Sequence, residues 1–196
     1  MNANKLVIGV TGMAGSGKSL VINVAREMGY DVVTMGDEVR EEARKRGLPP
    51  TPENLGKIML ELRQTEGEAA IAKRSALKVE SMANSKIIID GLRSLFEVEE
   101  FKKSYPDFCL IAIHASPETR FKRLFHRQRS DDTKDWKDFV KRDQRELGVG
   151  LGSAIAMAEY MIVNEEDLNK AKNKAAEILK KVEAKWTKSA SMSKPK

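Results

Sequence analysis

The chain has 196 residues, of which 41% are hydrophobic and 33% are charged, and its formal net charge is +6. This length accommodates one domain with a proper core and excludes two full-sized domains, and the composition excludes a disordered chain. The single cysteine, Cys109, excludes an intramolecular disulfide and fits a reducing compartment. Because the sequence contains neither a signal peptide nor a membrane-spanning run, we expect a cytoplasmic protein without a membrane partner. The positive charge suits a protein that handles nucleic acid or polyphosphates.

An apolar, β-branched run at residues 5–10 predicts a buried parallel strand, and helical spacing of apolar residues follows at residues 20–28. Between them lies a match to the phosphate-binding motif G-x-x-x-x-G-K-[ST]. The residues of this motif are expected to bind a nucleotide: Gly12, Met13, Ala14, Gly15, Ser16, Gly17, Lys18 and Ser19. Its glycines let successive N–H groups turn towards phosphate oxygens, and the following helix adds its positive N-terminal end. In this pattern Lys18 reaches the β- and γ-phosphates, and the Ser19 hydroxyl holds Mg²⁺.

Strand-like runs recur farther along the chain, and helical patterns separate them. They cover residues 31–35, 86–89, 108–114 and 160–163. This alternation predicts a parallel sheet with helices on both faces, in a single domain that spans about residues 1–185. Ligands of such sheets bind beyond the carboxyl ends of the strands, so the chemistry is expected in the segments that follow each strand.

Two segments interrupt this alternation. Residues 37–85 are interpreted as a helical insertion that closes over an acceptor substrate, with Thr51 as an N-cap and Pro52 at the first helical position. A charge-dense stretch at residues 127–135 is interpreted as a solvated loop or as part of a mobile lid at about residues 120–147. A last helix is expected to end near residue 186, followed by a disordered basic tail at residues 186–196.

Charged residues follow two of the predicted strands. Asp37 and Arg40 come just after the second strand, at a spacing that places both on one face of a helix. Asp37 is a candidate to position or deprotonate an acceptor hydroxyl, and Arg40 to bind an acceptor phosphate; the alternative is a helix N-cap and a surface arginine. Asp90 ends the third strand, where proteins with this loop place the carboxylate that meets Mg²⁺. Arg93 is a candidate ligand for a second phosphate oxygen.

A basic helix is expected after the fourth strand. Its apolar stripe leaves Arg120, Arg123 and Arg127 on or near another face. Convergent arginines stabilise the negative charge of a transferring phosphoryl group, so this face is a candidate phosphate site. The alternatives are a solvated basic face and a nucleic-acid patch. The next helical pattern carries Arg142 and Arg145 and is the expected far side of the lid.

The motifs described so far resemble those of P-loop small-molecule kinases of the adenylate kinase and dephospho-CoA kinase group. Residues 36–40 (GDEVR) are similar to the G-D-x-x-R segment that holds the acceptor phosphate in adenylate kinases. Residues 90–93 (DGLR) resemble their D-G-F-P-R, one residue short. Two residues depart from these patterns. Leu20 replaces the hydroxyl residue that often follows the loop serine, and Met35 stands where the dephospho-CoA kinase D-x-D has its first aspartate.

Single residues carry the same resemblance in the second half of the chain. The residues similar to lid arginines are Arg123, Arg127 and Arg129, with Arg142 or Arg145 on the far side. Asp37 equally resembles the acceptor-side aspartate of dephospho-CoA kinases, and Asn164 resembles the asparagine near their donor base. To about residue 185, the chain resembles an archaeal family of uncharacterised P-loop kinases related to both groups. The resemblance implies a three-layer α/β/α, nucleotide-kinase-like P-loop fold with a five-stranded parallel sheet in the order 2-3-1-4-5.

The motif and the resemblance together predict an Mg²⁺-dependent kinase that transfers the γ-phosphoryl group of ATP to a small, phosphorylated, nucleotide-like acceptor. The expected catalytic residues are Lys18, Asp37, Arg123, Arg127 and Arg129. The expected acceptor-binding residues are Asp37, Arg40, Arg93 and Arg142, and the expected metal ligands are Ser19 and Asp90. Two alternatives stay open: a nucleotide-dependent ATPase or switch that acts on RNA or a protein partner, and a kinase whose acceptor carries no phosphate. A monomer or a homodimer is expected.

Overall fold

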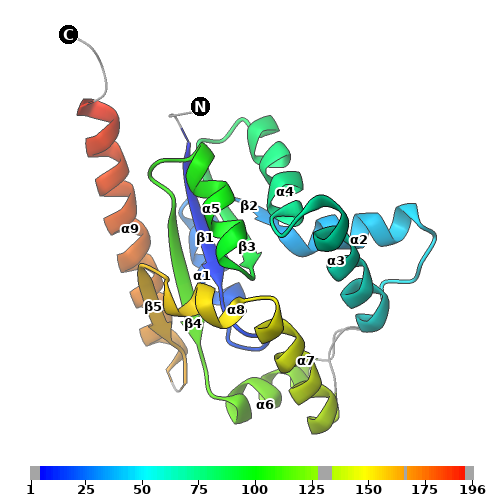
Figure 1. Ribbon diagram of the computed structural model, residues 1–196. Coiled ribbons are helices and arrows are strands. Elements are labelled where there is room, and N and C mark those ends of the chain that lie inside the picture. Colours follow the sequence, from blue (N-terminus) through cyan, green and yellow to red (C-terminus); the bar gives the residue numbers. More distant parts are fainter. Residues whose placement is uncertain (1–4, 128–133, 166, 193–196) are drawn as a thin grey trace.

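A single parallel sheet forms the centre of the structure, a computed structural model that describes residues 5–127, 134–165 and 167–192 (Figure 1). Within these residues five strands pair in the order β2-β3-β1-β4-β5, which confirms the predicted topology. The strands are β1 (Leu6–Thr11), β2 (Asp31–Thr34), β3 (Lys86–Leu92), β4 (Cys109–His114) and β5 (Tyr160–Val163). All neighbouring strands are parallel, so their carboxyl ends meet at one edge.

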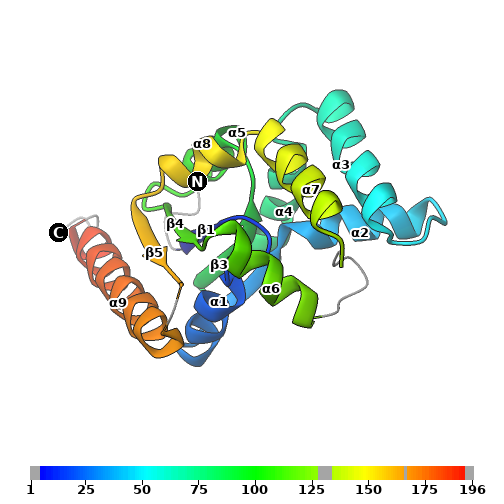
Figure 2. The same cartoon turned by 90° about the horizontal axis from the view of Figure 1, so that it is seen from below.

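Helices cover both faces of this sheet (Figure 2). On one face lie α1 (Lys18–Glu27) and α9 (Leu168–Met192), and on the other lie α4 (Ala70–Ser81), α5 (Leu95–Ser104) and α8 (Leu151–Ala156). Successive side chains of a strand point to opposite faces, so Ile8 of β1 packs in the core with α1 and α9, while Val7 packs in the core on the other face. The predicted α/β/α layering is therefore confirmed.

The helices predicted between the second and third strands are α2 (Met35–Lys45), α3 (Pro52–Glu66) and α4. The predicted start of α3 is confirmed, because the Thr51 hydroxyl accepts a hydrogen bond from the Asn54 N–H at 3.3 Å and Pro52 opens the helix. Ile58 and Leu62 of α3 are buried in the same core as Val7. This packing attaches the helical segment firmly to the sheet.

Two further helices, α6 (Pro117–Arg127) and α7 (Trp136–Gly148), lie beyond the carboxyl ends of the strands (Figure 1). Aromatic rings join them: the Phe121 ring centroid is 5.5 Å from that of Phe139 and 5.1 Å from that of Trp136. Residues 128–133, which include Arg129 and the centre of the predicted lid, lie outside the described residues.

The C-terminal boundary differs from the prediction. α9 continues past Trp186 to Met192, so the expected disordered tail is wrong over this stretch. The buried face of the helix, which includes Ile178 and Leu179, fixes it on the sheet, and Trp186 packs against the same core. Alanine and lysine are strong helix formers, so the polar composition that predicted disorder is compatible with a helix. None of the described helices is both long and apolar enough to cross a membrane.

Candidate functional site

The loop between β1 and α1 has the backbone shape that its motif predicts. Gly15 has φ +80°, and a Cβ atom there would lie 2.6 Å from the Arg120 carbonyl oxygen, so only glycine fits. α1 begins at Lys18 without a side-chain cap and without an acidic residue in its first turn. Its first N–H groups are therefore available to an anion in the loop. The Ser16 hydroxyl is buried and has no hydrogen-bond partner among the described residues, which also fits a loop shaped for an oxygen-rich ligand.

The Lys18 side chain turns back over this loop. Its Nζ atom donates to the carbonyl oxygens of Gly12 at 2.6 Å and Met13 at 3.3 Å. Burial lowers the pKa of Lys18 to about 8, although the negative charges of Asp90 and Glu146 act in the opposite direction. A phosphate group beside this amine would favour its charged form.

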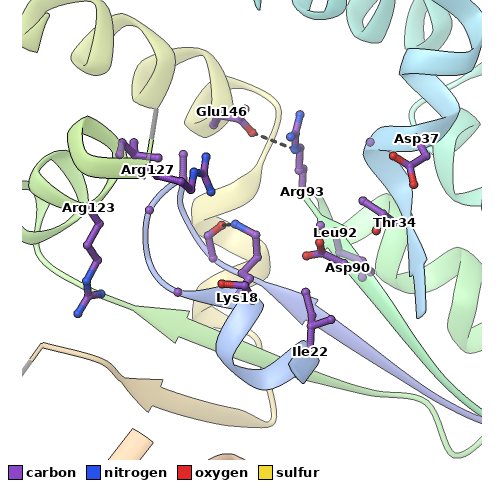
Figure 3. Close-up of a pocket in the computed structure, with 18 of the residues that line it drawn as sticks. Lys18, Ile22, Thr34, Asp37, Asp90, Leu92, Arg93, Arg123, Arg127 and Glu146 are labelled. Atoms are coloured by element: carbon purple, nitrogen blue, oxygen red, sulfur yellow. Dashed lines mark hydrogen bonds and ion pairs between the residues drawn. The ribbon is translucent and has the colours of Figure 1, made fainter. Parts of the chain in front are cut away.

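A cavity of about 680 Å³ opens beside the loop at the carboxyl ends of the strands. The predicted residues that line it are Gly12, Ala14, Gly15, Gly17, Lys18, Ser19, Asp37, Arg40, Asp90, Arg93, Arg123, Arg127 and Arg142. Arg123 and Arg127 enter from α6 on one side, and Asp37 enters from α2 on the other (Figure 3). The structure thus brings residues from five separate segments of the sequence to one space.

Asp37 and Arg40, in the first two turns of α2, form an ion pair with 2.8 Å between Oδ1 and Nη1. This contact confirms that the two side chains share a helix face. The N-cap position is occupied by Thr34, three residues before Asp37. Asp37 is therefore inside the helix, and the alternative interpretation of Asp37 as an N-cap is wrong.

The structure places the two predicted metal ligands, Ser19 and Asp90, at one cavity. Ser19 is exposed to the cavity at the start of α1, and Asp90 lines the same cavity from the end of β3. Among the described residues, no group of three or more His, Cys, Asp or Glu side chains is gathered to hold a metal. Mg²⁺ commonly takes one or two protein oxygens and completes its shell with water and substrate phosphates, so this sparse set fits Mg²⁺ held together with a nucleotide.

A bulge in β3 places Asp90 and Arg93 in the cavity. Val10 of β1 pairs with Asp90, but the next residue, Thr11, pairs with Leu92, so Gly91 is the extra residue. Gly91 has φ +97°, and the Thr11 hydroxyl donates to the Leu92 carbonyl oxygen at 2.7 Å. The bulge returns Leu92 to the core and lets both charged neighbours line the cavity.

Glu146 of α7 is a cavity residue that sequence reasoning missed. It is buried, and its Oε2 atom lies 3.1 Å from Nε of Arg93 (Figure 3). Burial acts to raise the pKa of Glu146, but the nearby charges of Arg93, Arg142 and Lys18 hold that pKa below its usual range. The available signal was its position four residues after Arg142, which places both on one helix face.

Arg120 has a different position from the one expected. Its guanidinium is buried, with Nη1 at 2.9 Å and Nη2 at 2.5 Å from the two carboxylate oxygens of Asp143 on α7. Nη1 also donates to the Ala14 carbonyl oxygen at 3.2 Å, and the group stacks 4.9 Å above the Phe139 ring centroid. Arg120 therefore supports the loop from outside and does not face the cavity. Sequence reasoning missed Asp143, its partner.

Asn164 also lies against the loop. Its side-chain amide donates to the Ser16 carbonyl oxygen at 2.9 Å, and Arg123 Nη1 donates to the same oxygen at 3.4 Å. Asn164 is buried and is not among the residues that line the cavity, so its described contact is with the loop backbone. Its expected position near a donor base stays a prediction.

Comparison with known proteins places this geometry in a family. A family model described as an AAA domain matches residues 11–139. A UPF0200 protein of Hyperthermus butylicus is 47% identical over 180 residues, which cover 92% of this chain and 96% of that protein. A UPF0200 protein of Methanothermobacter thermautotrophicus is 43% identical over 187 residues, covering 95% and 96%. The chain belongs to the UPF0200 family.

Solved structures similar to this UPF0200 protein include kinases. A gluconokinase from Sinorhizobium meliloti has a TM-score of 0.57 at 16% identity, with 96% of this chain and 99% of that chain covered. A shikimate kinase from Bacteroides thetaiotaomicron has a TM-score of 0.58 at 17% identity, covering 89% and 98%. At this level of identity the likeness concerns the fold, which is that of P-loop kinases. The relatives confirm the resemblance to an archaeal family.

Proposed function

We propose that this protein is an Mg²⁺-dependent kinase that transfers the γ-phosphoryl group of ATP to a small phosphorylated acceptor. The observation that carries the proposal is one cavity with a phosphate-binding loop at its base and Arg40, Arg93 and Arg142 around it. Guanidinium groups bind phosphate oxygens in pairs of hydrogen bonds, so these arginines suit an anionic acceptor facing the donor.

The donor side is formed by the loop and α6. The backbone N–H groups of residues 12–19 would surround the donor phosphates, and Lys18 would neutralise the group being transferred. Ser19 and Asp90 would hold Mg²⁺, which supplies further neutralisation of phosphate charge. Arg123 and Arg127 line the loop side of the cavity and would stabilise the developing negative charge. Arg129 keeps its expected role only as a prediction.

The acceptor side continues into a second, smaller cavity of about 70 Å³. It shares Arg40, Arg93 and Arg142 with the large cavity and adds apolar residues of α2 and α3, among them Val39 and Leu55. An acceptor with a charged end and a compact apolar part fits this pair of cavities. Asp37 lies at the border of the large cavity and would orient the attacking oxygen. Catalysis would then come from positioning and electrostatics.

The alternative of an RNA-stimulated ATPase was based on the basic face of α6. That face is largely occupied: Arg120 is paired with Asp143, Arg123 donates to the loop, and Arg127 lines the cavity. These contacts favour a role in phosphate chemistry within the protein over contact with an external polyanion.

The test is ATP consumption with Mg²⁺ against a panel of nucleoside monophosphates, dephospho-CoA, nucleosides and no acceptor, with and without RNA. We expect one acceptor to be phosphorylated in proportion to the ADP formed. Lys18→Ala should lose transfer by several orders of magnitude, and Arg40→Ala should raise the acceptor KM with little change in the ATP KM. ADP release that needs no acceptor and rises with RNA would replace the kinase by an RNA-dependent ATPase.

A further inference from the structure

Glu146 is a buried carboxylate at the junction of the two cavities. It lines both of them, its side chain is 7% exposed, and it is paired with Arg93. Among the described residues that line the smaller cavity, Glu146 is the one carboxylate beside four arginines, and its negative charge weakens the attraction of this cavity for phosphate. The binding of donor phosphates therefore does not explain why the Glu146 carboxylate lies here.

The helix that carries Glu146 is fixed at two places. Asp143, one turn earlier, is paired with Arg120, which holds the loop at Ala14. After the helix, Gly150 turns with φ +100°, and a Cβ there would lie 3.5 Å from Cβ of Ser94, just beyond the end of β3. Helix α7 is thus held near both the loop and the end of β3, and this placement puts the Glu146 carboxylate beside Arg93.

Arg93 is held as firmly from its own side. Its backbone N–H donates to Oε2 of Glu97 at 2.7 Å, and Glu97 forms a buried ion pair of 2.5 Å with Arg63. The position of the Arg93 backbone is therefore set independently of Glu146.

The ion pair uses only one edge of the Arg93 guanidinium. Glu146 lies at Nε, and among the described contacts Nη1 reaches only the sulfur of Met59, at 3.4 Å, which is a weak acceptor. This side-on arrangement directs the terminal nitrogens, which bind an oxyanion best, to a ligand. One anionic group can therefore bind end-on to Arg93 while the Glu146 carboxylate remains beside it.

We propose that Glu146 determines acceptor specificity: it selects a ligand with one anionic group for Arg93 and a neighbouring hydroxyl or N–H that donates to Glu146, and it excludes two adjacent bare anionic groups. The second anionic group of an excluded ligand would lie against the carboxylate and be repelled. This inference rests on the proposed function, because it describes the acceptor side of that same site.

Two probes of contrasting chemistry test it by titration calorimetry with the loop already saturated by Mg·ADP. Inorganic pyrophosphate has two adjacent anionic groups, and glycerol 3-phosphate has one anionic group with hydroxyls. Glu146→Gln keeps the shape and removes the charge, so we expect the ratio of the two affinities to shift towards pyrophosphate by about tenfold. Asp138→Asn is the matched control, because Asp138 is exposed on the same helix and pairs with Lys141 at 3.3 Å; its ratio should equal that of the wild type.

A ratio that Glu146→Gln leaves unchanged, or shifts towards glycerol 3-phosphate, overturns the proposal. Glu146→Asp keeps the charge, so it should preserve the wild-type ratio, and it remains informative where the glutamine variant does not fold. A shift in Glu146→Asp equal to that in Glu146→Gln would mean that packing and not charge is responsible, and would also overturn it. These titrations need no phosphoryl transfer, so failure of the kinase assay is a separate result.

Discussion

Lys18 shows how one side chain is prepared for phosphate. Burial lowers its pKa to about 8 from the ordinary value of 10.5, with Asp90 and Glu146 opposing the change. In the free protein its two carbonyl contacts, at Gly12 and Met13, take the place of phosphate oxygens. The amine is therefore held at the loop in a state whose charge depends on pH near neutrality.

This pKa predicts the pH dependence of nucleotide binding. Below about pH 8 the free protein has a charged Lys18 amine, and above it the amine loses its proton unless a phosphate retains it. Binding therefore requires proton uptake at higher pH, and the dissociation constant for Mg·ADP should rise by up to about tenfold per pH unit above that point. Titration calorimetry between about pH 7 and 10 measures this rise in the dissociation constant. Lys18→Arg keeps its charge throughout and should give a flat profile; a flat wild-type profile would contradict the assignment.

Among the elements, α7 carries more of the site than its sequence indicates. Its Asp143 pairs with the buried Arg120, and its Glu146 pairs with Arg93, so a single helix contacts both α6 and the end of β3. Loss of one partner of a buried ion pair leaves an unpaired charge in the interior, which is strongly destabilising.

Asp143→Ala is therefore expected to lower the free energy of unfolding by about 3–5 kcal/mol, because Arg120 stays buried without its counter-ion. Asp138→Ala on the same helix breaks only an exposed pair and should change it by less than about 1 kcal/mol. Urea unfolding measures both. Equal small effects in the two variants would show that the Arg120 pair contributes little and that the loop is supported by other contacts.

The contacts of α7 belong to the part of the site that could not be predicted from the sequence. The Thr51 cap and the Asp37–Arg40 pair were predictable because each follows from local spacing, and the strand order was predictable only through the resemblance to P-loop kinases. The partners of Arg93 and Arg120 were not, because both pairs join segments far apart in sequence and have no periodic signal. The C-terminal end of α9 was also missed, since its last turns are polar and compatible with either helix or coil.

At the scale of the whole molecule, the cavity is assembled from parts that lie far apart along the chain. The loop follows β1 of the sheet, while the arginines proposed to bind the acceptor come from α2, from the end of β3 and from α7. A ligand that contacts all of them holds the peripheral helices against the sheet, and it does so only in the folded protein. Ligand binding should therefore stabilise the fold as a whole.

Thermal unfolding tests this linkage. A non-hydrolysable ATP analogue with Mg²⁺, at one hundred times its dissociation constant, should add about 2.7 kcal/mol to the free energy of unfolding. For a domain of this size that corresponds to an increase in Tm of roughly 5–10 °C. Lys18→Ala should show a smaller increase at the same ligand concentration, since it lacks the charge at the loop, whereas Asp138→Asn should match the wild type. An unchanged Tm in the wild type would contradict nucleotide binding at the loop. The same measurement with a non-hydrolysable GTP analogue compares the two donors, and a larger increase in Tm with that analogue would identify GTP as the preferred donor.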